Sequence, residues 1–208
     1  MSVGTTERTR IAVLVSGSGS NLQALIDASL DPDFGAEIAV VIADRPHVSA
    51  LDRAAAQDID HVVVAWSDFF DRAAFTAAIC DVARRYEVAG LVLAGFMRIL
   101  ARGAIEQYPD AIINVHPALL PAFPGADAVG RALAHGVTVT GVTVHFVDEQ
   151  VDHGPIILQE AVAVRSGDTV AVLHGRIQKI EHRVFPRVVD AFGKGLLRVE
   201  GRRVEWTS

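Results

Sequence analysis

The first half of the chain alternates short apolar runs with segments of helical periodicity. Each apolar run is continuous rather than alternating, which is typical of a strand covered on both faces of a sheet. These runs occupy residues 11–15, 38–43, 61–65, 91–94 and 111–115. The helical segments occupy residues 21–29, 48–57, 68–86 and 101–108. This alternation predicts right-handed crossover units and a Rossmann-like open, parallel sheet.

The segment 68–86 carries the clearest helical pattern. Apolar residues recur there at intervals of three and four residues. They are Phe69, Ala73, Ala77, Cys80 and Ala83. We expect these five side chains to form the face of the helix that packs against the sheet.

The pattern changes after residue 136. Residues 137–147 alternate between apolar and polar, and residues 155–164 form a second strand-like run with no helix between the two. The two runs are predicted to pair antiparallel and to extend the parallel sheet. The chain closes with a predicted hairpin over residues 196–199 and 202–206.

A long helix is predicted over residues 169–192, where apolar residues form a single stripe. The stripe consists of Val170, Leu173, Ile177, Ile180, Val184 and Val188. Ser166, Gly167 and Asp168 would supply the preceding turn and the cap. Pro186 is expected to kink or interrupt the helix, because proline lacks the N–H that a helix interior needs.

Together these elements predict an α/β fold. We expect an open sheet with a parallel N-terminal part, an antiparallel C-terminal extension and flanking helices. No repeat, low-complexity stretch or linker interrupts the sequence, so a single domain over residues 1–208 is predicted. Residues 1–9 are polar and are interpreted as a flexible tail.

The amino-acid composition and net charge limit the kinds of molecule that the protein is expected to bind. The chain has 208 residues, of which 50% are hydrophobic, and a formal net charge of -6. This acidic balance argues against nucleic acid or an anionic membrane, because both attract clustered Lys and Arg. Cys80 is the only cysteine, so no disulfide can form within the chain, and a cytoplasmic location is expected. No apolar run reaches the roughly 18–20 residues that cross a bilayer.

A glycine-rich segment, Ser16-Gly-Ser-Gly-Ser-Asn-Leu22, follows the first strand and opens the first helix. Glycines allow close approach of the backbone, and a helix N-terminus offers free N–H groups and a partial positive charge. Such a turn can bind phosphate even in an acidic protein. An ordinary tight turn between strand and helix would show the same glycines, so this alternative stays open.

Asn114 and His116 stand at the end of the fifth predicted strand, where open α/β sheets bind ligands. Being two residues apart in a strand, they face the same side. An amide donor beside an imidazole can stabilise an oxyanion, and the imidazole can also carry protons near neutral pH. A capped strand end with a structural histidine is the alternative.

The polar segment 148–155 joins two strands that otherwise look buried. Its carboxylate Asp152 is placed to orient His116 or to relay protons through water. Asp and Gly are also turn residues, so a plain hairpin turn is the competing interpretation.

The eight histidines do not suggest a metal site, because none of them shows the paired spacing of zinc ligands and there is no second cysteine. No Gly-x-Ser-x-Gly elbow indicates nucleophilic catalysis. The basic residues near the C-terminus are interpreted as a solvated face. They are Arg183, Arg187, Arg198, Arg202 and Arg203.

Five strings of the sequence, in the right order, resemble the phosphoribosylglycinamide formyltransferases, a family of folate-dependent formyltransferases. They are Ser16-Gly-Ser-Gly-Ser-Asn-Leu-Gln-Ala24, Leu93-Ala-Gly-Phe-Met-Arg-Ile-Leu100, Ile113-Asn-Val-His-Pro117, Leu119-Leu-Pro-Ala-Phe-Pro-Gly125 and Asp152-His-Gly-Pro155. The similarity extends over about residues 10–192, and the string that ends at Leu100 is the most distinctive.

The resemblance implies transfer of a formyl group from 10-formyltetrahydrofolate to the amine of 5-phosphoribosylglycinamide, in de novo purine biosynthesis. Formyl-folate would be a co-substrate, and no metal would be needed. The partners would be small molecules, with no nucleic acid or membrane, and the enzyme would be a monomer or homodimer.

Matching the motifs assigns residues to roles. Asn114, His116 and Asp152 would be catalytic, with His145 near the active site. The ribonucleotide would be held by Gly19, Ser20, Asn21 and Glu181. Formyl-folate would contact Arg72, Met97, Arg98, Ile99, Leu100, Asn114, Asp148 and Val151. Asp127 and Gly130 depart from the family, which commonly has His and Arg at these positions.

The mechanism expected from this match begins with attack of the free amine on the formyl carbon. Asn114 and a protonated His116 would stabilise the oxyanion. Asp152 would favour the charged imidazole and help to move a proton from the amine to N10 of the folate through water.

Three alternatives remain at this point. Methionyl-tRNA formyltransferases resemble this sequence at Asn-x-His-Pro and the distal Asp, but they carry an additional C-terminal domain and need a basic surface for tRNA. Formyltetrahydrofolate hydrolases carry an N-terminal regulatory domain that is not expected here. A non-catalytic phosphate-binding module would keep Asn114 and His116 for structural reasons only.

Overall fold

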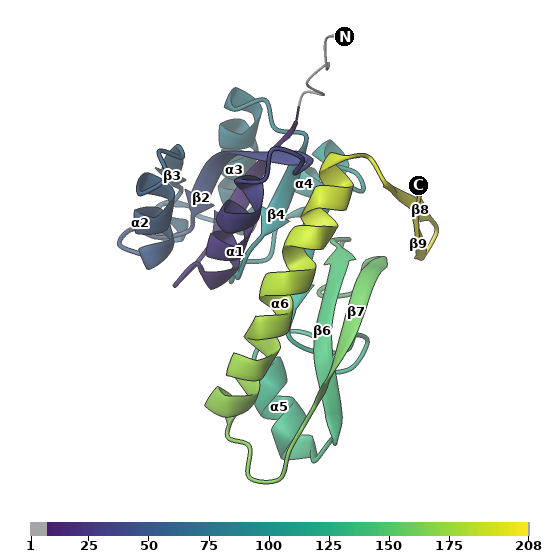
Figure 1. Ribbon diagram of the computed structural model, residues 1–208. Coiled ribbons are helices and arrows are strands. Elements are labelled where there is room, and N and C mark those ends of the chain that lie inside the picture. Colours follow the sequence, from purple (N-terminus) through teal and green to yellow (C-terminus); the bar gives the residue numbers. More distant parts are fainter. Residues whose placement is uncertain (1–7, 208) are drawn as a thin grey trace.

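The computed structural model describes residues 8–207, and nine strands of this range form one sheet in the order β3-β2-β1-β4-β5-β6-β7-β9-β8 (Figure 1). The strands are β1 (Thr9–Val15), β2 (Ala36–Ala43), β3 (His61–Val63), β4 (Gly90–Leu93), β5 (Ile112–His116), β6 (Val139–Phe146), β7 (Ile156–Ala163), β8 (Leu197–Glu200) and β9 (Arg203–Trp206). The helices are α1 (Ser20–Ser29), α2 (Ser49–Ala55), α3 (Arg72–Arg85), α4 (Arg102–Gln107), α5 (Ala128–His135) and α6 (Val170–Gly193), with one 3-10 turn, η1 (Trp66–Asp68).

Strand directions confirm the predicted fold class. The first five strands run parallel to one another. Strand β6 runs antiparallel to both β5 and β7, as the alternating pattern predicts. The terminal hairpin is also present, and its strand β9 pairs in parallel with β7 between Arg203 and Ile156. The structure is therefore a mixed α/β sheet with a parallel N-terminal part and an antiparallel extension.

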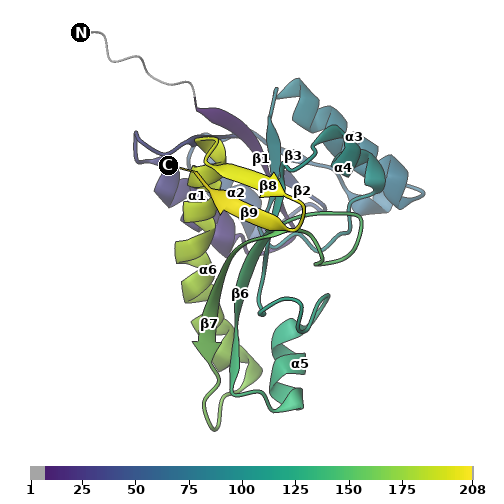
Figure 2. The same ribbon diagram turned by 90° about the vertical axis from the view of Figure 1, so that its right-hand side faces the viewer.

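Both faces of the parallel part are covered, which explains its continuous apolar runs. In β1, Ile11 and Val13 point into a core shared with α1, α2 and α6, whereas Ala12 and Leu14 point into a core shared with the helices α3 and α4. All four side chains are fully buried. Figure 2 shows the two groups of helices on opposite sides of the sheet. Burial of both faces fixes the register of the strands and so the positions of the loops at their ends.

Helix α3 packs with a different face from the one expected. It begins at residue 72 rather than 68, because the Asp71 carboxylate caps its first turn. Phe75 and Ile79 are buried, whereas Ala73 and Ala77 are exposed. The predicted stripe is confirmed at Cys80 and Ala83, which are buried, and is wrong at Ala73 and Ala77. Alanine contributes little apolar area, so the larger side chains decide which face goes inward.

Helix α6 continues through Pro186 to residue 193, so the expectation of an interruption is wrong. Its cap is Thr169, whose side chain accepts from the Val172 N–H at 3.3 Å. Asp168, the expected cap, instead pairs with Arg176 at 2.8 Å. The helix therefore reaches as one rod from the α5 end of the molecule to the amino end of β1, where Thr9 Oγ1 donates to the Gly193 carbonyl oxygen at 2.7 Å (Figure 1).

Helix α5 is an element that the apolar pattern does not predict. It has eight residues and contains Gly130, so it is too short and has too low a helix propensity to be recognised from the sequence. Its buried residues, Ala128, Val129 and Ala132, have helical spacing but small volume.

The predicted flexible tail, residues 1–9, lies outside the described residues except for Arg8 and Thr9. There the prediction is wrong, because Thr9 begins β1 and Arg8 donates to the carbonyl oxygens of Ser29 and Asp31 at 3.0 and 2.8 Å. Between residues 8 and 207, no helix has both the length and the apolar character to cross a membrane. In the same range, no group of three His, Cys, Asp or Glu side chains is arranged to hold a metal ion.

Candidate active site

The expected site residues gather where the carboxyl ends of β1, β4 and β5 meet. Strand β1 lies between β2 and β4, so the order of strands changes direction at this point. Ligands of open α/β sheets bind at such switch points. The glycine-rich turn follows β1, residues 94–100 follow β4, and Asn114 and His116 end β5.

Asp152 approaches these two residues from the loop between β6 and β7. One carboxylate oxygen, Oδ1, lies 3.4 Å from Asn114 Nδ2, and the other, Oδ2, lies 3.2 Å from His116 Nδ1. The structure thus brings together the three residues that motif matching assigns to catalysis, although they lie up to 38 positions apart in the chain.

His145 sets the direction of the Asn114 amide. Strand pairing places the two residues opposite each other. His145 Nδ1 lies 2.7 Å from the carbonyl oxygen of Phe146, which can only accept, so Nδ1 carries a proton. Nε2 lies 3.2 Å from the Asn114 amide nitrogen and 3.6 Å from Asp152 Oδ1. Asn114 consequently presents its N–H groups, not its carbonyl, towards His145 and Asp152.

Backbone groups of the segment after β5 complete the cluster. His116 Nε2 donates to the carbonyl oxygen of Phe123 at 2.9 Å, which leaves Nδ1 directed at Asp152. The Gly125 N–H donates to Asp152 Oδ2 at 2.7 Å. Asp152 itself has a φ of 51°, a left-handed conformation that residues with a Cβ rarely adopt. Sequence reasoning did not find these partners, because backbone groups leave no residue-type signal.

Burial and charge act in opposite directions on His116 and Asp152. Burial lowers the pKa of His116, and this outweighs the raising effects of the Asp152 charge and the Phe123 carbonyl. Burial alone would raise the pKa of Asp152, but the His145 ring, the Gly125 N–H and the His116 charge together hold it below its usual value. In the free protein at neutral pH, the cluster therefore contains an ionised Asp152 and a neutral His116. This differs from the expected imidazolium.

The titration of His116 tests this electrostatic picture. We expect its pKa, measured by NMR of the imidazole nuclei, to lie below the ordinary value of about 6.5. In an Asp152→Asn variant it should fall further, because the carboxylate charge that favours the imidazolium is gone. The signal that disappears in a His116→Asn variant identifies the ring. A wild-type pKa above 6.5, or an upward shift in Asp152→Asn, would contradict this account.

The glycine-rich turn lines a cavity of about 240 Å³ beside the cluster. Gly19 has a φ of 71° and caps α1, so the first N–H groups of the helix open towards the cavity. Ser16 Oγ accepts from the Met97 N–H at 2.8 Å and ties the turn to the segment after β4. The opposite wall comes from α6 and includes His174 and Glu181. The cavity thus combines a helix N-terminus with polar side chains.

Asn21 and Glu181 form a buried pair at the base of this cavity. Asn21 Nδ2 donates to Glu181 Oε2 at 2.9 Å, and both residues are buried. The side-chain amide oxygen of Asn21, Oδ1, is also buried but has no hydrogen-bond partner among the described residues. A free buried acceptor next to a cavity is suited to a ligand that donates a hydrogen bond.

Arg53 adds a full positive charge behind the turn. Its Nε donates to the Ser18 carbonyl at 2.8 Å, and its Nη1 donates to Gln23 Oε1 at 2.9 Å. The sequence analysis expected the backbone alone to supply the positive potential for an anion, and it did not single out Arg53. A guanidinium bound to the turn adds to the helix dipole there.

Three of the residues expected on the folate side are exposed apolar side chains in the segments that carry the cluster or flank it. Met97, Ile99 and Val151 are large apolar side chains that remain 70%, 51% and 49% exposed. Glu149, from the loop of Val151, lies 3.4 Å from Arg102, so this loop and the segment after β4 lie side by side. Exposed apolar side chains that flank a polar cluster are typical of a binding surface for a partly aromatic ligand.

Three other residues expected on the folate side differ in their surroundings. Leu100 is buried in the core under the loop. Asp148 pairs with His153 at 2.6 Å. Arg72 is exposed in the first turn of α3, one turn before Thr76, whose hydroxyl accepts from the Ala101 N–H. Leu100 and Asp148 are therefore engaged by other parts of the protein, whereas the exposed Arg72 side chain is open to a ligand.

Arg98 is held by a buried carboxylate that the sequence analysis did not identify. Its Nε donates to Asp44 Oδ2 at 2.7 Å, and its guanidinium carbon lies 5.2 Å from the centre of the Trp66 ring. The Asp44 side chain is fully buried and lies directly after β2. The position of Asp44 at the carboxyl end of a strand was the available signal.

The two departures from the family, Asp127 and Gly130, fit each other. The Asp127 carboxylate occupies the space beside Gly130, where an added Cβ would lie 2.5–2.8 Å from its atoms. Asp127 also adopts a left-handed φ of 54°. A larger residue at position 130 would therefore displace the Asp127 side chain, so the two departures are structurally coupled.

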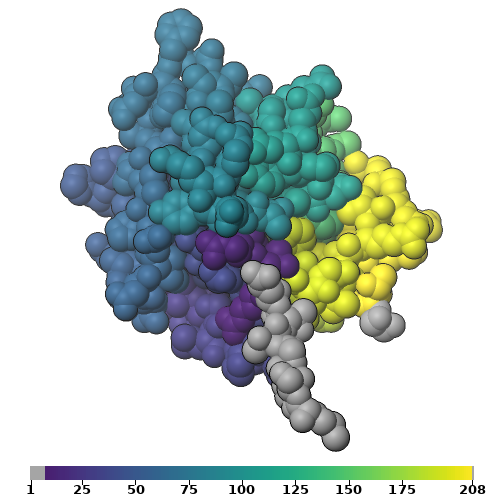
Figure 3. Space-filling model, turned by 90° about the horizontal axis from the view of Figure 1, so that it is seen from above, coloured from purple at the N-terminus to yellow at the C-terminus, as the bar shows by residue number. Residues whose placement is uncertain are grey.

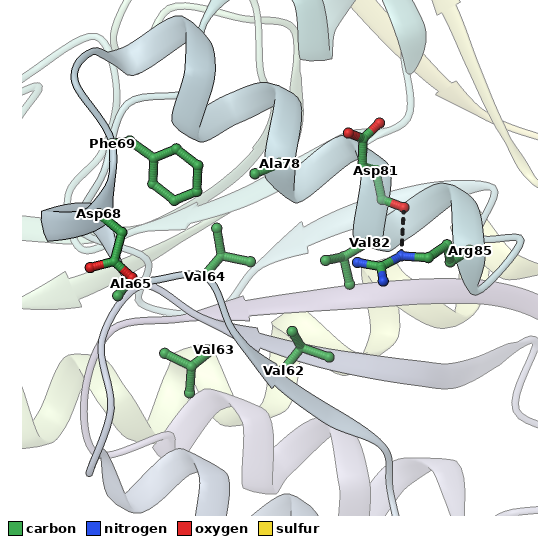
Figure 4. A pocket seen from close by; sticks show the side chains of 10 residues that line it. All are labelled: Val62, Val63, Val64, Ala65, Asp68, Phe69, Ala78, Asp81, Val82 and Arg85. Atoms are coloured by element: carbon green, nitrogen blue, oxygen red, sulfur yellow. Dashed lines mark hydrogen bonds between the residues drawn. The ribbon is translucent and has the colours of Figure 1, made fainter.

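A second hollow, of about 280 Å³, lies away from this site at the edge strand β3 (Figure 4). Its walls are mainly apolar side chains of β3 and α3, with Asp68, Asp81 and Arg85 at the rim. Arg85 Nε donates to the Asp81 carbonyl oxygen at 3.3 Å rather than into the hollow. No set of polar groups converges there, so the chemistry belongs to the β1–β4–β5 end of the sheet.

Comparison with known proteins identifies relatives of the whole chain. The sequence profile of the formyl transferase family matches residues 9–189. A phosphoribosylglycinamide formyltransferase of Bacillus subtilis is 41% identical over 180 residues, which cover 86% of this chain and 92% of that protein. A trifunctional purine biosynthetic protein of Bos taurus is 44% identical over 203 residues, but this chain spans only 20% of its length.

The fold of this chain is also similar to that of a solved structure. A glycinamide ribonucleotide transformylase from Symbiobacterium toebii superposes with a TM-score of 0.94 and 45% sequence identity. The match covers 97% of this chain and 95% of that one. The similarity therefore includes every element that contributes to the site.

Proposed function

Because the chain belongs to the formyl transferase family, we propose that it transfers a formyl group from 10-formyltetrahydrofolate to the amine of 5-phosphoribosylglycinamide. This reaction is a step of de novo purine biosynthesis. The observation that carries the proposal is the position of the cluster Asn114, His116 and Asp152, which lies between an anion-binding cavity and an exposed apolar surface.

The cavity beside the glycine-rich turn suits the phosphate end of the ribonucleotide. Gly19, Ser20 and Asn21 form the N-terminus of α1, and Arg53 adds positive charge behind it. Glu181, on the opposite wall, suits the hydroxyl or amine groups of the same substrate, because its carboxylate can only accept hydrogen bonds. The reacting amine would then be directed towards β5.

The apolar mouth suits the pterin and benzoyl parts of the folate. Met97, Ile99 and Val151 give it exposed apolar area. The exposed Arg72 would give it positive charge for the acidic tail, whereas the charge of Arg98 is compensated by Asp44. Since two substrates must meet, much of the rate enhancement would come from holding them together in the right orientation.

The reaction forms one C–N bond and breaks another. The amine nitrogen attacks the formyl carbon, the carbonyl oxygen becomes an oxyanion, and the intermediate then releases N10 of the folate. We place one Asn114 N–H at the oxyanion: the one that lies 3.4 Å from Asp152 Oδ1 in the free protein would turn to the oxyanion when the substrates are bound. The amine must lose one proton and N10 must gain one. His116 Nδ1, neutral in the free protein and 3.2 Å from Asp152, can take up the proton of the amine because the carboxylate stabilises the resulting imidazolium. The imidazolium then gives this proton to N10 through water as the bond between the formyl carbon and N10 breaks.

The test is an absorbance assay for loss of the formyl group from 10-formyltetrahydrofolate, with the ribonucleotide added or omitted. We expect turnover only when 5-phosphoribosylglycinamide is present. Turnover without it would make the protein a hydrolase, and turnover only with methionyl-tRNA would make it a tRNA formyltransferase. Absence of turnover under all three conditions would favour the non-catalytic phosphate-binding module.

A further inference from the structure

The C-terminal hairpin of β8 and β9 reaches the loop that carries Asp152. Besides the pairing of β9 with β7, Trp206 Nε1 donates to the carbonyl oxygen of Ile157 at 3.2 Å. The Arg187 guanidinium packs over the Trp206 ring at 5.1 Å. The hairpin is thereby fixed to the edge of the sheet, where it lies in front of the strands in Figure 2 and forms a lobe beside the middle part of the chain in Figure 3.

Arg202, in the turn of this hairpin, contacts His153, the residue that follows Asp152. Its Nη2 donates to the carbonyl oxygen of His153 at 2.6 Å, and its Nη1 lies 3.3 Å from each nitrogen of the His153 ring. The same ring is 2.6 Å from Asp148 Oδ2. The interpretation of Arg202 as part of a solvated face is therefore wrong: it is exposed, but it joins the C-terminal hairpin to the catalytic loop.

The loop needs such a support for two physical reasons. Asp152 adopts a left-handed backbone conformation, which persists only where neighbouring contacts hold it. The loop also carries three carboxylates within five residues, at Asp148, Glu149 and Asp152, which repel one another. Arg102 supplies a counter-charge at Glu149, and Arg202 supplies a second one at His153, whose ring contacts Asp148.

We propose that Arg202 is a positioning residue, which holds His153 so that the Asp152 carboxylate stays against Asn114 and His116. This inference rests on the proposed formyl transfer for its effect on rate. Arg202 contacts none of the three cluster residues, so it acts through the backbone of the loop. Because Val151 and Asp148 lie in the same loop, the support also extends to the folate side.

The test compares Arg202→Ala with Arg203→Ala. Arg203 is the adjacent arginine, is exposed, and makes no side-chain hydrogen bond or ion pair within residues 8–207. We expect Arg202→Ala to lower kcat/KM for formyl-folate about fivefold, the effect of losing a charge-assisted hydrogen bond. The KM for the ribonucleotide should stay unchanged, Arg202→Lys should restore part of the loss because lysine can donate to the same carbonyl, and Arg203→Ala should change nothing.

A second measurement keeps the test independent of turnover. If Arg202 positions Asp152, the NMR titration of His116 should shift to lower pH in Arg202→Ala, as in Asp152→Asn, and should not shift in Arg203→Ala. Equal kinetics and equal titrations of the two arginine variants would overturn the inference. If the wild-type protein shows no formyl transfer, the proposed function fails, and the His116 titration still decides the role of Arg202.

Discussion

Asp152→Asn should lower kcat by about 10²- to 10⁴-fold, the usual contribution of a positioned acid–base group. The KM values of both substrates should change by less than about threefold, because the amide keeps the size and place of the carboxylate. The loss arises from the missing charge: once His116 takes up a proton, no anion stands 3.2 Å away to stabilise it. Steady-state kinetics with each substrate varied in turn measures this split.

The matched control is Asp58→Asn. Asp58 is exposed, lies between α2 and β3, and has a φ of 52°, nearly the same as the 51° of Asp152. It undergoes the same chemical change on the same type of backbone, away from the site, so its kinetics should equal those of the wild type. An Asp152→Asn enzyme with kcat within about twofold of the wild type would remove Asp152 from the proton relay.

Part of the site could be predicted because it follows from strand geometry. Asn114 and His116 share a side because a strand has a period of two, and they lie at the ligand-binding edge because β5 is parallel to β4. The contact of Asp152 with these two residues could not be predicted in this way. No periodicity relates a loop residue to a strand 38 positions away, and only the resemblance to a family implied that contact.

The partners that tune the cluster could not be predicted. Phe123 and Gly125 act through a carbonyl and an N–H, which every residue type except proline possesses. Burial, which lowers the pKa of His116, is a property of the assembled loops rather than of the residues beside it in sequence. For this reason the sequence suggested a charged His116, whereas the structure supports a neutral one in the free protein.

The fold, like the site, has elements that could be predicted from the sequence and contacts that could not. The strands of the parallel part could be predicted because two covered faces demand continuous apolar runs. The terminal hairpin could be recognised but not placed, since its attachment depends on a single backbone pair and on the Trp206 contact with Ile157. Arg202 was consequently read as solvated. Its contact with His153 appears only once the hairpin is seen against β7.

Gly19→Ala should raise the KM for the ribonucleotide by at least about tenfold and leave the KM for formyl-folate nearly unchanged. A Cβ at Gly19 would lie 2.7 Å from the Ala50 Cβ and 2.8 Å from its Cα, so the turn or α2 must move. The backbone of Ala50 cannot rotate away as a side-chain tip can. Movement of the turn displaces the first N–H groups of α1. A phosphate bound by several aligned donors loses affinity with each donor that is displaced, and a tenfold loss of affinity corresponds to roughly 1.4 kcal/mol of binding free energy.

Gly136→Ala separates this effect from simple strain. Gly136 has a φ of 78° at the end of α5, but an added Cβ meets nothing within 4 Å there. Gly136→Ala should lose about 1–2 kcal/mol of stability, because alanine disfavours the left-handed region. Gly19→Ala should lose more, because the added Cβ also meets Ala50. Only Gly19→Ala should lose ribonucleotide affinity, which calorimetric titration with the ribonucleotide can measure alongside urea unfolding. Equal ribonucleotide affinity in the two variants would show that the phosphate is bound elsewhere than at the N-terminus of α1.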